Sequence, residues 1–437
     1  MITKKQFLLL FLLAFLFRLA FGLLQASCQG TDQLQTYLIG LKCYATGTWP
    51  YFGPDVNGNE NLSFHSQVPG ALEGLLIGLP FYLLPIPEAP FIVLNFFSTL
   101  GIALLTWYIC KRLPDISYTW LFIWISIAPW SLHEATHILN PSFIFLPSIL
   151  FFIGFLESTP LFTLNLISPA LANALMGFSL FWIMQFHFSY VYLLPLTAFS
   201  LAVQIKNTRK LGCLFYFILG SLPTLGLLIP AYIQYGLARN NVASGFVVPF
   251  NPWYNFMEFV TIIARFLSLA SFEMPRFIGD GSKTRFAYLN NHSWLWGPGG
   301  FLWIAGYIQP FVLLFGWFRK DSVGPHWRNL KFLLLAVWLM VEVSFCFTTK
   351  LPLTHIYFVF FPLVMIYSCF CWVRFAPQRH WRLLAQVFLI LGVFFQMGYA
   401  LTYEPQNSLY AQREPMAKAI HEKNYHLLGE RRPGSLY

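Results

Sequence analysis

Long apolar runs separated by short polar turns occupy most of the chain. A helix needs about 20 apolar residues to cross the hydrocarbon core of a bilayer. Runs of roughly this length predict about eleven transmembrane helices, near 6–24, 90–110, 117–132, 141–156, 163–183, 186–204, 211–235, 299–318, 332–346, 356–373 and 383–401. The pattern therefore predicts an all-α polytopic membrane protein.

One further apolar stretch, 70–84, is interrupted by Pro80 and Pro85 and contains Glu73. We expect it to lie in the outer membrane interface rather than to cross the bilayer. Counting it as a full span would place the basic turns that follow on the outer side, against the rule that Lys and Arg collect in cytoplasmic loops.

The positions of Lys and Arg predict the orientation of the chain. With the N-terminus inside, the cytoplasmic turns hold fourteen of the 27 basic residues: Lys4, Lys5, Lys111, Arg112, Lys206, Arg209, Lys210, Arg319, Lys320, Arg328, Lys331, Arg374, Arg379 and Arg382. This leaves a membrane domain, 1–401, with two large outer loops at 25–89 and 236–298 that carry interfacial helices. A short outer tail follows at 402–437.

Composition agrees with a membrane protein, since 57% of residues are hydrophobic, 10% charged and 19% aromatic. Soluble domains carry about 25% charged residues, and the aromatic excess suits lipid-facing surfaces and interfacial belts. The net charge of +10 does not indicate nucleic acid, because the basic residues form no long run. The seven cysteines lack metal-ligand spacing. Cys28 and Cys43 share an outer loop, and whether they pair stays open.

The N-terminal segment and the cytoplasmic turns exclude several classes of protein. Lys4 and Lys5 before an apolar stretch resemble a signal peptide, but the stretch is long and many spans follow, so we expect an uncleaved first span. The cytoplasmic turns are too short for a nucleotide-binding domain, and there is no P-loop or dinucleotide fingerprint. Any chemistry is therefore expected at the outer face, with an activated donor that arrives within the membrane.

The first outer loop holds three candidate residues. Asp32 follows the first span at the start of a predicted helix, where it is either an N-cap or a catalytic acid, and the two roles are compatible. His65 and Gln67 lie just before the interfacial stretch. They either anchor that stretch or line a site for a lipid-borne head group.

The second outer turn, 130–141, contains His133, Glu134, His137 and Asn140. Residues 133–137 match the HExxH zinc motif literally, which requires both imidazoles on one helix and a third ligand. Asn140-Pro141 breaks the helix directly afterwards, and spacing offers no third ligand. We therefore favour a polar wall of a site over a metalloprotease and expect no metal.

Two further polar groups occur at predicted outer ends of spans. Gln185 and His187, with Ser189, are either a binding surface or satisfied interhelical hydrogen bonds. Lys350 and His355 suit a phosphate leaving group, as a compact cation and a hydrogen-bond donor. The alternative is a lysine that snorkels to the head groups.

The ordered set of features resembles the GT-C superfamily of membrane glycosyltransferases, in the branch of the lipid A aminoarabinose transferase and the protein O-mannosyltransferases. The resemblance covers roughly residues 8–375. It rests on Asp32 with a Tyr37 helix, Gly47-x-Trp49, Pro69-Gly70, Lys111-Arg112, the turn at 130–141, Gln185-x-His187-x-Ser189 and Lys350-Leu351-Pro352-x-x-His355-x-Tyr357.

The resemblance implies a polyprenyl-phosphate sugar donor, no cofactor, and a lipid, glycan or protein acceptor at the outer face of a bacterial inner membrane. Asp32 matches the essential acid of the first loop and would serve as general base. Lys350 and His355 match the region that contacts the donor phosphate, and Tyr357 in the same motif is expected to bind substrate. Members often carry a second Asp where this chain has Asn140, so either Glu134 substitutes or the acceptor differs.

Two other classes of function stay open at this point. A transporter or flippase of lipid-linked glycans would show inverted repeats and charges along a membrane pathway. A non-catalytic membrane scaffold would tolerate Asp32→Asn, whereas an enzyme of the kind above would not.

Overall fold

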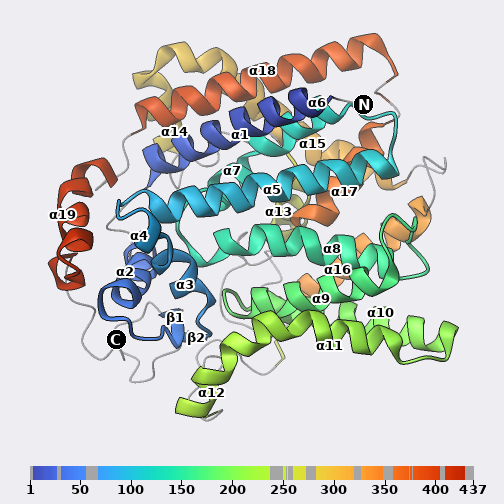
Figure 1. Cartoon of the computed structure of the whole chain (residues 1–437). Coiled ribbons are helices and arrows are strands. Elements are labelled where there is room, and N and C mark those ends of the chain that lie inside the picture. Colours follow the sequence, from blue (N-terminus) through green and yellow to red (C-terminus); the bar gives the residue numbers. More distant parts are fainter. Residues whose placement is uncertain are drawn as a thin grey trace.

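The computed structural model describes residues 3–26, 31–55, 67–236, 250–251, 253, 259–271, 282–318, 326–347, 358–373, 375, 377–403 and 409–428. Long helices lie side by side along one common direction (Figure 1). They are α1 (Lys4–Gln25), α5 (Ala89–Arg112), α6 (Tyr118–Ile127), α8 (Phe145–Ser158), α9 (Pro169–Met184), α10 (Tyr190–Thr208), α11 (Gly212–Leu225), α15 (Trp296–Trp317), α16 (Trp327–Phe345), α17 (Phe361–Trp372) and α18 (Arg379–Thr402).

Each predicted apolar segment overlaps one of these helices. Within the described residues, six helical stretches are long and apolar enough to cross a membrane: Lys4–Gln25, Ala89–Arg112, Asn140–Ser158, Gly212–Tyr235, Ser293–Trp317 and Arg379–Thr402. The prediction of a helical integral membrane protein is confirmed. The number of eleven crossings stays a prediction.

The remaining elements connect or follow these helices. They are α2 (Thr31–Thr46), β1 (Phe52–Asp55), β2 (Gln67–Pro69), α3 (Leu72–Gly78), α4 (Pro80–Leu83), α7 (Pro129–Glu134), η1 (Asn140–Ile144), η2 (Gly226–Leu228), α12 (Ile229–Tyr235), α13 (Phe259–Ser268), α14 (Ser282–Asn291), η6 (Ser293–Leu295), α19 (Leu409–His421) and η8 (Tyr425–Leu428). Elements α2, α3, α4, β1, β2 and α19 gather at one end of the bundle (Figure 1). We call this the loop end. The opposite end, where α1 and α18 begin and α5 finishes with Lys111 and Arg112, is the basic end.

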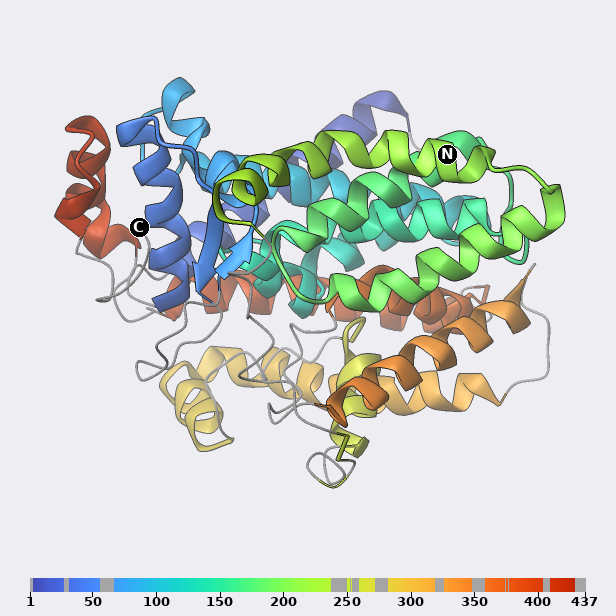
Figure 2. The same ribbon diagram turned by 90° about the horizontal axis from the view of Figure 1, so that it is seen from below.

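The helices differ in how much apolar surface they expose. Helix α8 lies in the core, since 83% of the Asn140–Ser158 window is buried, whereas only 11% of the Gly212–Tyr235 window is. Figure 2 shows α9, α10 and α11 along one flank and α13, α15 and α16 along the other. An apolar flank of this extent in water would be costly. It fits contact with lipid instead.

The stretch 70–84 forms two short helices, α3 of seven residues and α4 of four. Both are far shorter than the roughly 20 residues needed to cross a bilayer. Leu79, Tyr82 and Leu83 are exposed, with Leu83 at 91%. This geometry agrees with a segment that rests in the interface.

An ion pair fixes the basic end of the core. Arg112 in α5 contacts Glu157 in α8 at 2.9 Å, and both side chains are buried. Tyr108 donates to the same carboxyl oxygen at 2.8 Å, while the other oxygen accepts from the backbone N–H of Leu164 and Leu166. Removing one partner of such a pair would leave an uncompensated buried charge.

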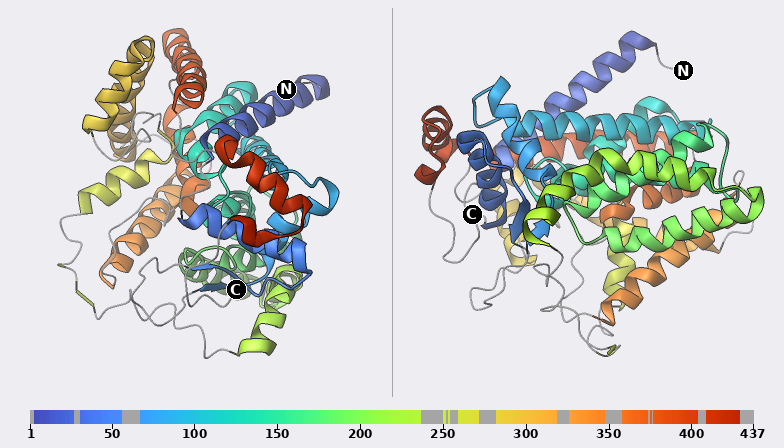
Figure 3. Two further views of the ribbon diagram at one scale, coloured as in Figure 1. Left: turned by 90° about the vertical axis from the view of Figure 1, so that its left-hand side faces the viewer. Right: turned by 60° about the horizontal axis from the view of Figure 1, so that its bottom comes forward.

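The described part of the predicted outer tail contains a helix that covers the loop end. Helix α19 lies across the first outer loop (Figure 3, left). The backbone N–H of Leu409 donates to the carbonyl of Ala26, and Arg413 pairs with Glu88 at 2.6 Å. The chain after α18 is thereby attached to the segment that precedes α2.

Candidate functional site

Arg18 in α1 is fully buried and holds the second outer turn in place. Its guanidinium donates to the carbonyl oxygens of Ser126 at 2.8 Å and Ser131 at 2.7 Å, and to the hydroxyl of Ser98. A charged side chain at membrane depth is expensive unless it is satisfied in this way. Arg18 therefore joins α1 to α5, α6 and α7, and it sets where the following residues lie.

The HExxH match does not lie on one helix. Helix α7 ends at Glu134, and His137 follows in a turn. The Nδ1 of His137 is 2.6 Å from the carbonyl oxygen of His133, so this nitrogen donates a hydrogen bond to the backbone. In the HExxH zinc motif the two imidazoles lie one turn apart on the same face of a continuous helix. The backbone at 133–137 therefore departs from the continuous helix of the zinc-protease motif.

Instead, the turn packs where α1 and α18 meet. The ring of His133 lies against Phe21 of α1, with centroids 4.9 Å apart, and against Tyr399 of α18 at 5.6 Å. Gln25 at the end of α1 donates to the carbonyl oxygen of Tyr403 at 3.0 Å. The turn is therefore fixed between the first and last predicted spans.

Burial sets the protonation of this turn. It lowers the pKa values of His133 and His137, so both imidazoles are neutral near pH 7. It raises the pKa of the Glu134 carboxyl to about 7. A carboxyl with that pKa can both accept and donate a proton at physiological pH, which is the property of a general acid or base.

A second contact brings the first outer loop to the same turn. The hydroxyl of Thr36, fully buried in α2, donates to Asn140 Oδ1 at 3.3 Å. The predicted helix after the first span is confirmed. Because α2 begins at Thr31, Asp32 lies in its first turn, one helical turn before Thr36. The helix that carries the predicted acid thus reaches the second outer turn.

Gln185 joins three helices at the loop end. Its Oε1 accepts from the backbone N–H of Leu72 in α3 at 3.3 Å, and its Nε2 donates to the carbonyl oxygens of Thr224 at 2.8 Å and Phe181 at 3.1 Å. These bonds use the amide within the protein and fix the start of α3 against α9 and α11. The interhelical hydrogen bonds, one of the two alternatives for Gln185, are present, and its role in a binding surface stays a prediction.

Gly70 makes this junction possible. Its φ of +135° is unfavourable for residues with a side chain, and an added Cβ would lie 2.4 Å from Gln185 Cγ. The glycine of the Pro69-Gly70 pair is therefore explained by the close approach of β2 and α3 to α9.

His187 lies beside this junction. Its Nδ1 accepts from the backbone N–H of Ser189 at 3.2 Å, which places the proton of the neutral ring on Nε2. Tyr192 nearby hydrogen-bonds the Ser344 hydroxyl at 2.7 Å. This contact brings α10 to the end of α16, close in sequence to the segment that contains Lys350.

The structure does not place every candidate. Asp32 and Gln67 are described by their backbone alone, in α2 and β2. Four candidates lie outside the described residues: His65, Lys350, His355 and Tyr357. Among the described candidates, Asn140 contacts the helix that carries Asp32, through the hydroxyl of Thr36. Gln185 and His187 lie instead where α3 packs against α9 and α11.

Glu73 is a buried acid that was not among the predicted site residues. In the sequence it served only as evidence that 70–84 does not cross the membrane. It lies in the first turn of α3 and is fully buried, and a Cβ added at Gly53 would lie 2.7 Å from its Oε2. The signal available in the sequence was an acid within an apolar, glycine-flanked stretch.

The fold and these contacts define an integral membrane protein with polar groups from separate helices assembled at the loop end. No protein-family description and no curated protein sequence matches the chain. Among solved structures it is similar to ArnT from Cupriavidus metallidurans bound to undecaprenyl phosphate, with 12% identity over 98% of this chain and 78% of that chain. The TM-score is 0.48. A match at this level assigns neither a substrate nor a residue role to this chain.

Proposed function

We propose that the protein is a membrane glycosyltransferase. It moves a sugar from a polyprenyl-phosphate donor to a lipid, glycan or protein acceptor at the loop end, which faces the outside. The observation that carries this proposal is the Thr36–Asn140 contact, which sets the helix bearing Asp32 against the second outer turn with its Glu134 carboxyl. An acid beside a second polar segment is what deprotonation of an acceptor hydroxyl requires.

The chemistry is a single displacement at the anomeric carbon with inversion. Asp32 accepts the acceptor proton as the new C–O bond forms and the bond to the lipid phosphate breaks. Lys350 and His355 stabilise the charge that develops on the departing phosphate, and His65, Gln67 and Tyr357 contact the donor. Fixed donors aimed at developing charge are a major source of rate enhancement. Glu134 assists with proton transfer because its pKa is near neutrality.

The contacts of the buried charges favour an enzyme over a transporter. A transport pathway requires charged side chains that meet the substrate or coupling ion within the membrane. Arg18 is bound to backbone carbonyls, Arg112 to Glu157, and Glu342 accepts from Trp338 at 2.9 Å. These described charges have structural partners within the fold.

Asp32→Asn tests the proposal, because amide replaces carboxylate at nearly constant volume. We expect turnover to fall by about 10²–10⁴-fold, the usual cost of removing a positioned base, while binding of the donor is unchanged. The measurement is transfer of a radiolabelled sugar from lipid extracts in membranes with equal amounts of protein. Glu422→Gln, an exposed acid in the tail, is the matched control.

Two results would contradict the mechanism. Unchanged turnover in Asp32→Asn would remove this residue from the chemistry. A product that keeps the anomeric configuration of the donor would exclude a single displacement.

A further inference from the structure

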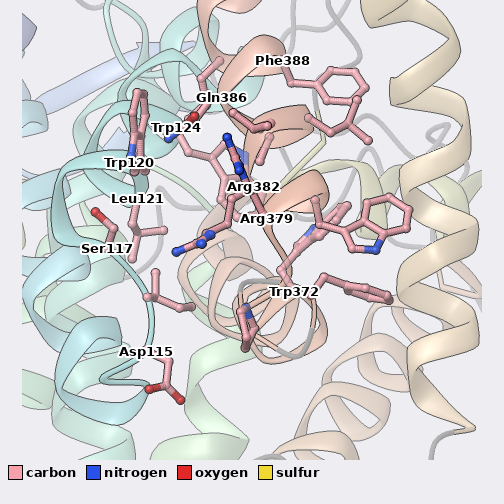
Figure 4. Close-up of a pocket in the computed structure, with 18 of the residues that line it drawn as sticks. Asp115, Ser117, Trp120, Leu121, Trp124, Trp372, Arg379, Arg382, Gln386 and Phe388 are labelled. Atoms are coloured by element: carbon pink, nitrogen blue, oxygen red, sulfur yellow. The ribbon is translucent and has the colours of Figure 1, made fainter.

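A cavity of about 690 Å³ opens at the basic end, far from the site above. It lies between α6, α15 and the start of α18 (Figure 4). Most of its wall is aromatic or aliphatic: Trp120, Leu121, Trp124, Trp372, Phe388 and Leu389. A volume of this size is within the range of small-molecule sites, about 300–1,000 Å³.

Two arginines enter this apolar cavity. Arg379 and Arg382 are three residues apart on α18 and therefore share a face of the helix. Figure 4 shows both guanidinium groups in the middle of the cavity, between the Trp120 side and Trp372. Neither makes an ion pair or a side-chain hydrogen bond within the described part of the chain. Asp115 is the single acid among the lining residues and lies at the edge of the cavity.

Arg379 and Arg382 are both exposed beside this apolar wall, and neither is paired with a described residue, which suits one kind of ligand. Each guanidinium presents a planar fork of donors that matches phosphate oxygens. The tryptophan and leucine walls match hydrocarbon, which a soluble phosphate compound lacks. Leu383, 51% exposed on the same turn of α18, extends the apolar wall toward the lipid-facing surface.

We infer that this cavity binds the phosphate head group of an anionic phospholipid from the cytoplasmic leaflet. Basic pockets between helices on the cytoplasmic side of a membrane are suited to anionic head groups. The site is separate from the proposed reaction, because Arg382 and Tyr399 are 17 residues apart on α18, about 26 Å along a helix. It does not depend on the identity of the sugar or acceptor.

Native mass spectrometry of the full-length protein, extracted from nanodiscs of phosphatidylglycerol and phosphatidylethanolamine, tests the inference. We expect the wild type to retain phosphatidylglycerol in preference. The double variant Arg379→Gln/Arg382→Gln should lose this preference by about tenfold, since both charge-assisted contacts are removed. Arg328→Gln, an exposed arginine at the same end outside the cavity, is the matched control and should keep it.

A second variant separates the cavity from the folding of α18. Ala305→Trp fills the cavity from α15 and retains both arginines, and it too should lose the bound lipid. Retention of phosphatidylglycerol at the wild-type level in either variant would overturn the inference. Equal retention of phosphatidylethanolamine by the wild type would also overturn it, because the cavity would then not select an anionic head group.

Discussion

At the scale of single residues, the fold depends on buried polar side chains that connect distant parts of the sequence. Arg18 reaches Ser126 and Ser131, more than 100 residues away. Arg18 lies inside the first apolar run, but the sequence offers no partner for it, because hydrogen bonds to backbone carbonyls cannot be read from a residue pattern. The sequence also placed the helix break at Asn140-Pro141, whereas α7 already ends at Glu134, inside the literal HExxH match at 133–137.

Replacing Arg18 tests its structural role. Arg18→Met leaves the carbonyl oxygens of Ser126 and Ser131 without their donor, and each unsatisfied buried acceptor costs about 1–3 kcal/mol. We therefore expect the free energy of unfolding to fall by on the order of 3 kcal/mol. The measurement is the thermal midpoint in detergent, which should fall clearly. Arg18→Lys should recover only part of this, because an ammonium cannot reproduce the fork. Arg413→Gln, which breaks a partly exposed pair, should change stability by less than about 1 kcal/mol.

Glu134 predicts a pH dependence. Burial raises its pKa from 4.5 to about 7, so between these values the folded protein holds a proton that the unfolded chain has lost. Its contribution to stability is therefore complete below about pH 4.5 and is lost as the pH rises through 7. We expect thermal midpoints of the wild type to fall, relative to Glu134→Gln, from pH 5 to pH 8. His133 and His137 titrate in both proteins and cancel in the difference, so parallel curves would contradict the raised pKa.

At the scale of elements, local sequence patterns predicted the helices but not the contacts between them. Every predicted apolar run has a helix, and 70–84 is broken at Leu79–Pro80, because hydrophobic length and proline act within one segment. The loop end depends on pairs such as Thr36–Asn140 and Leu72–Gln185, separated by 104 and 113 residues. Such pairs cannot be derived from periodicity. The sequence therefore predicted which residues are candidates, but not which of them lie close together.

The β2–α3 junction gives an element-scale prediction. Gly70→Ala places a Cβ 2.4 Å from Gln185 Cγ at a φ of +135°, and we expect a loss of about 1–3 kcal/mol in unfolding experiments. Combining it with Gln185→Ala removes the contacts with Cγ and Oε1 but leaves Gln185 Cβ 2.8 Å from the added Cβ, so the clash is relieved in part. The double variant should be less destabilised than the sum of the singles. Gly212→Ala, which meets nothing within 4 Å, is the control. Strict additivity would mean that the two residues do not meet.

At the scale of the whole molecule, the two ends differ in chemistry. The loop end carries the short helices and the candidate site, and the basic end carries the arginines of the Arg112–Glu157 pair and of the cavity. Under the positive-inside rule the basic end faces the cytoplasm. This orientation stays a prediction.

Reporter fusions test the orientation. Fusions after Pro114 and after Thr208 should report a cytoplasmic position, whereas fusions near Asn140 and Asn290 should report the outside. Protease protection in sealed vesicles provides an independent measurement at the same four sites. A cytoplasmic signal near Asn140 would separate the second outer turn from the proposed donor side and would contradict the assembly.

The junction of α1 with α18 has a consequence for how the protein is made. Gln25 contacts Ala400 and Tyr403, residues that leave the ribosome more than 370 positions later. Helix α19, whose Leu409 binds Ala26, emerges later still. Helix α1 must therefore be inserted without these contacts, and it forms them only after α18 has been inserted. The loop end therefore acquires its final geometry only after these segments are synthesised, and a nascent chain arrested before α18 would lack the contacts of Gln25 and Ala26.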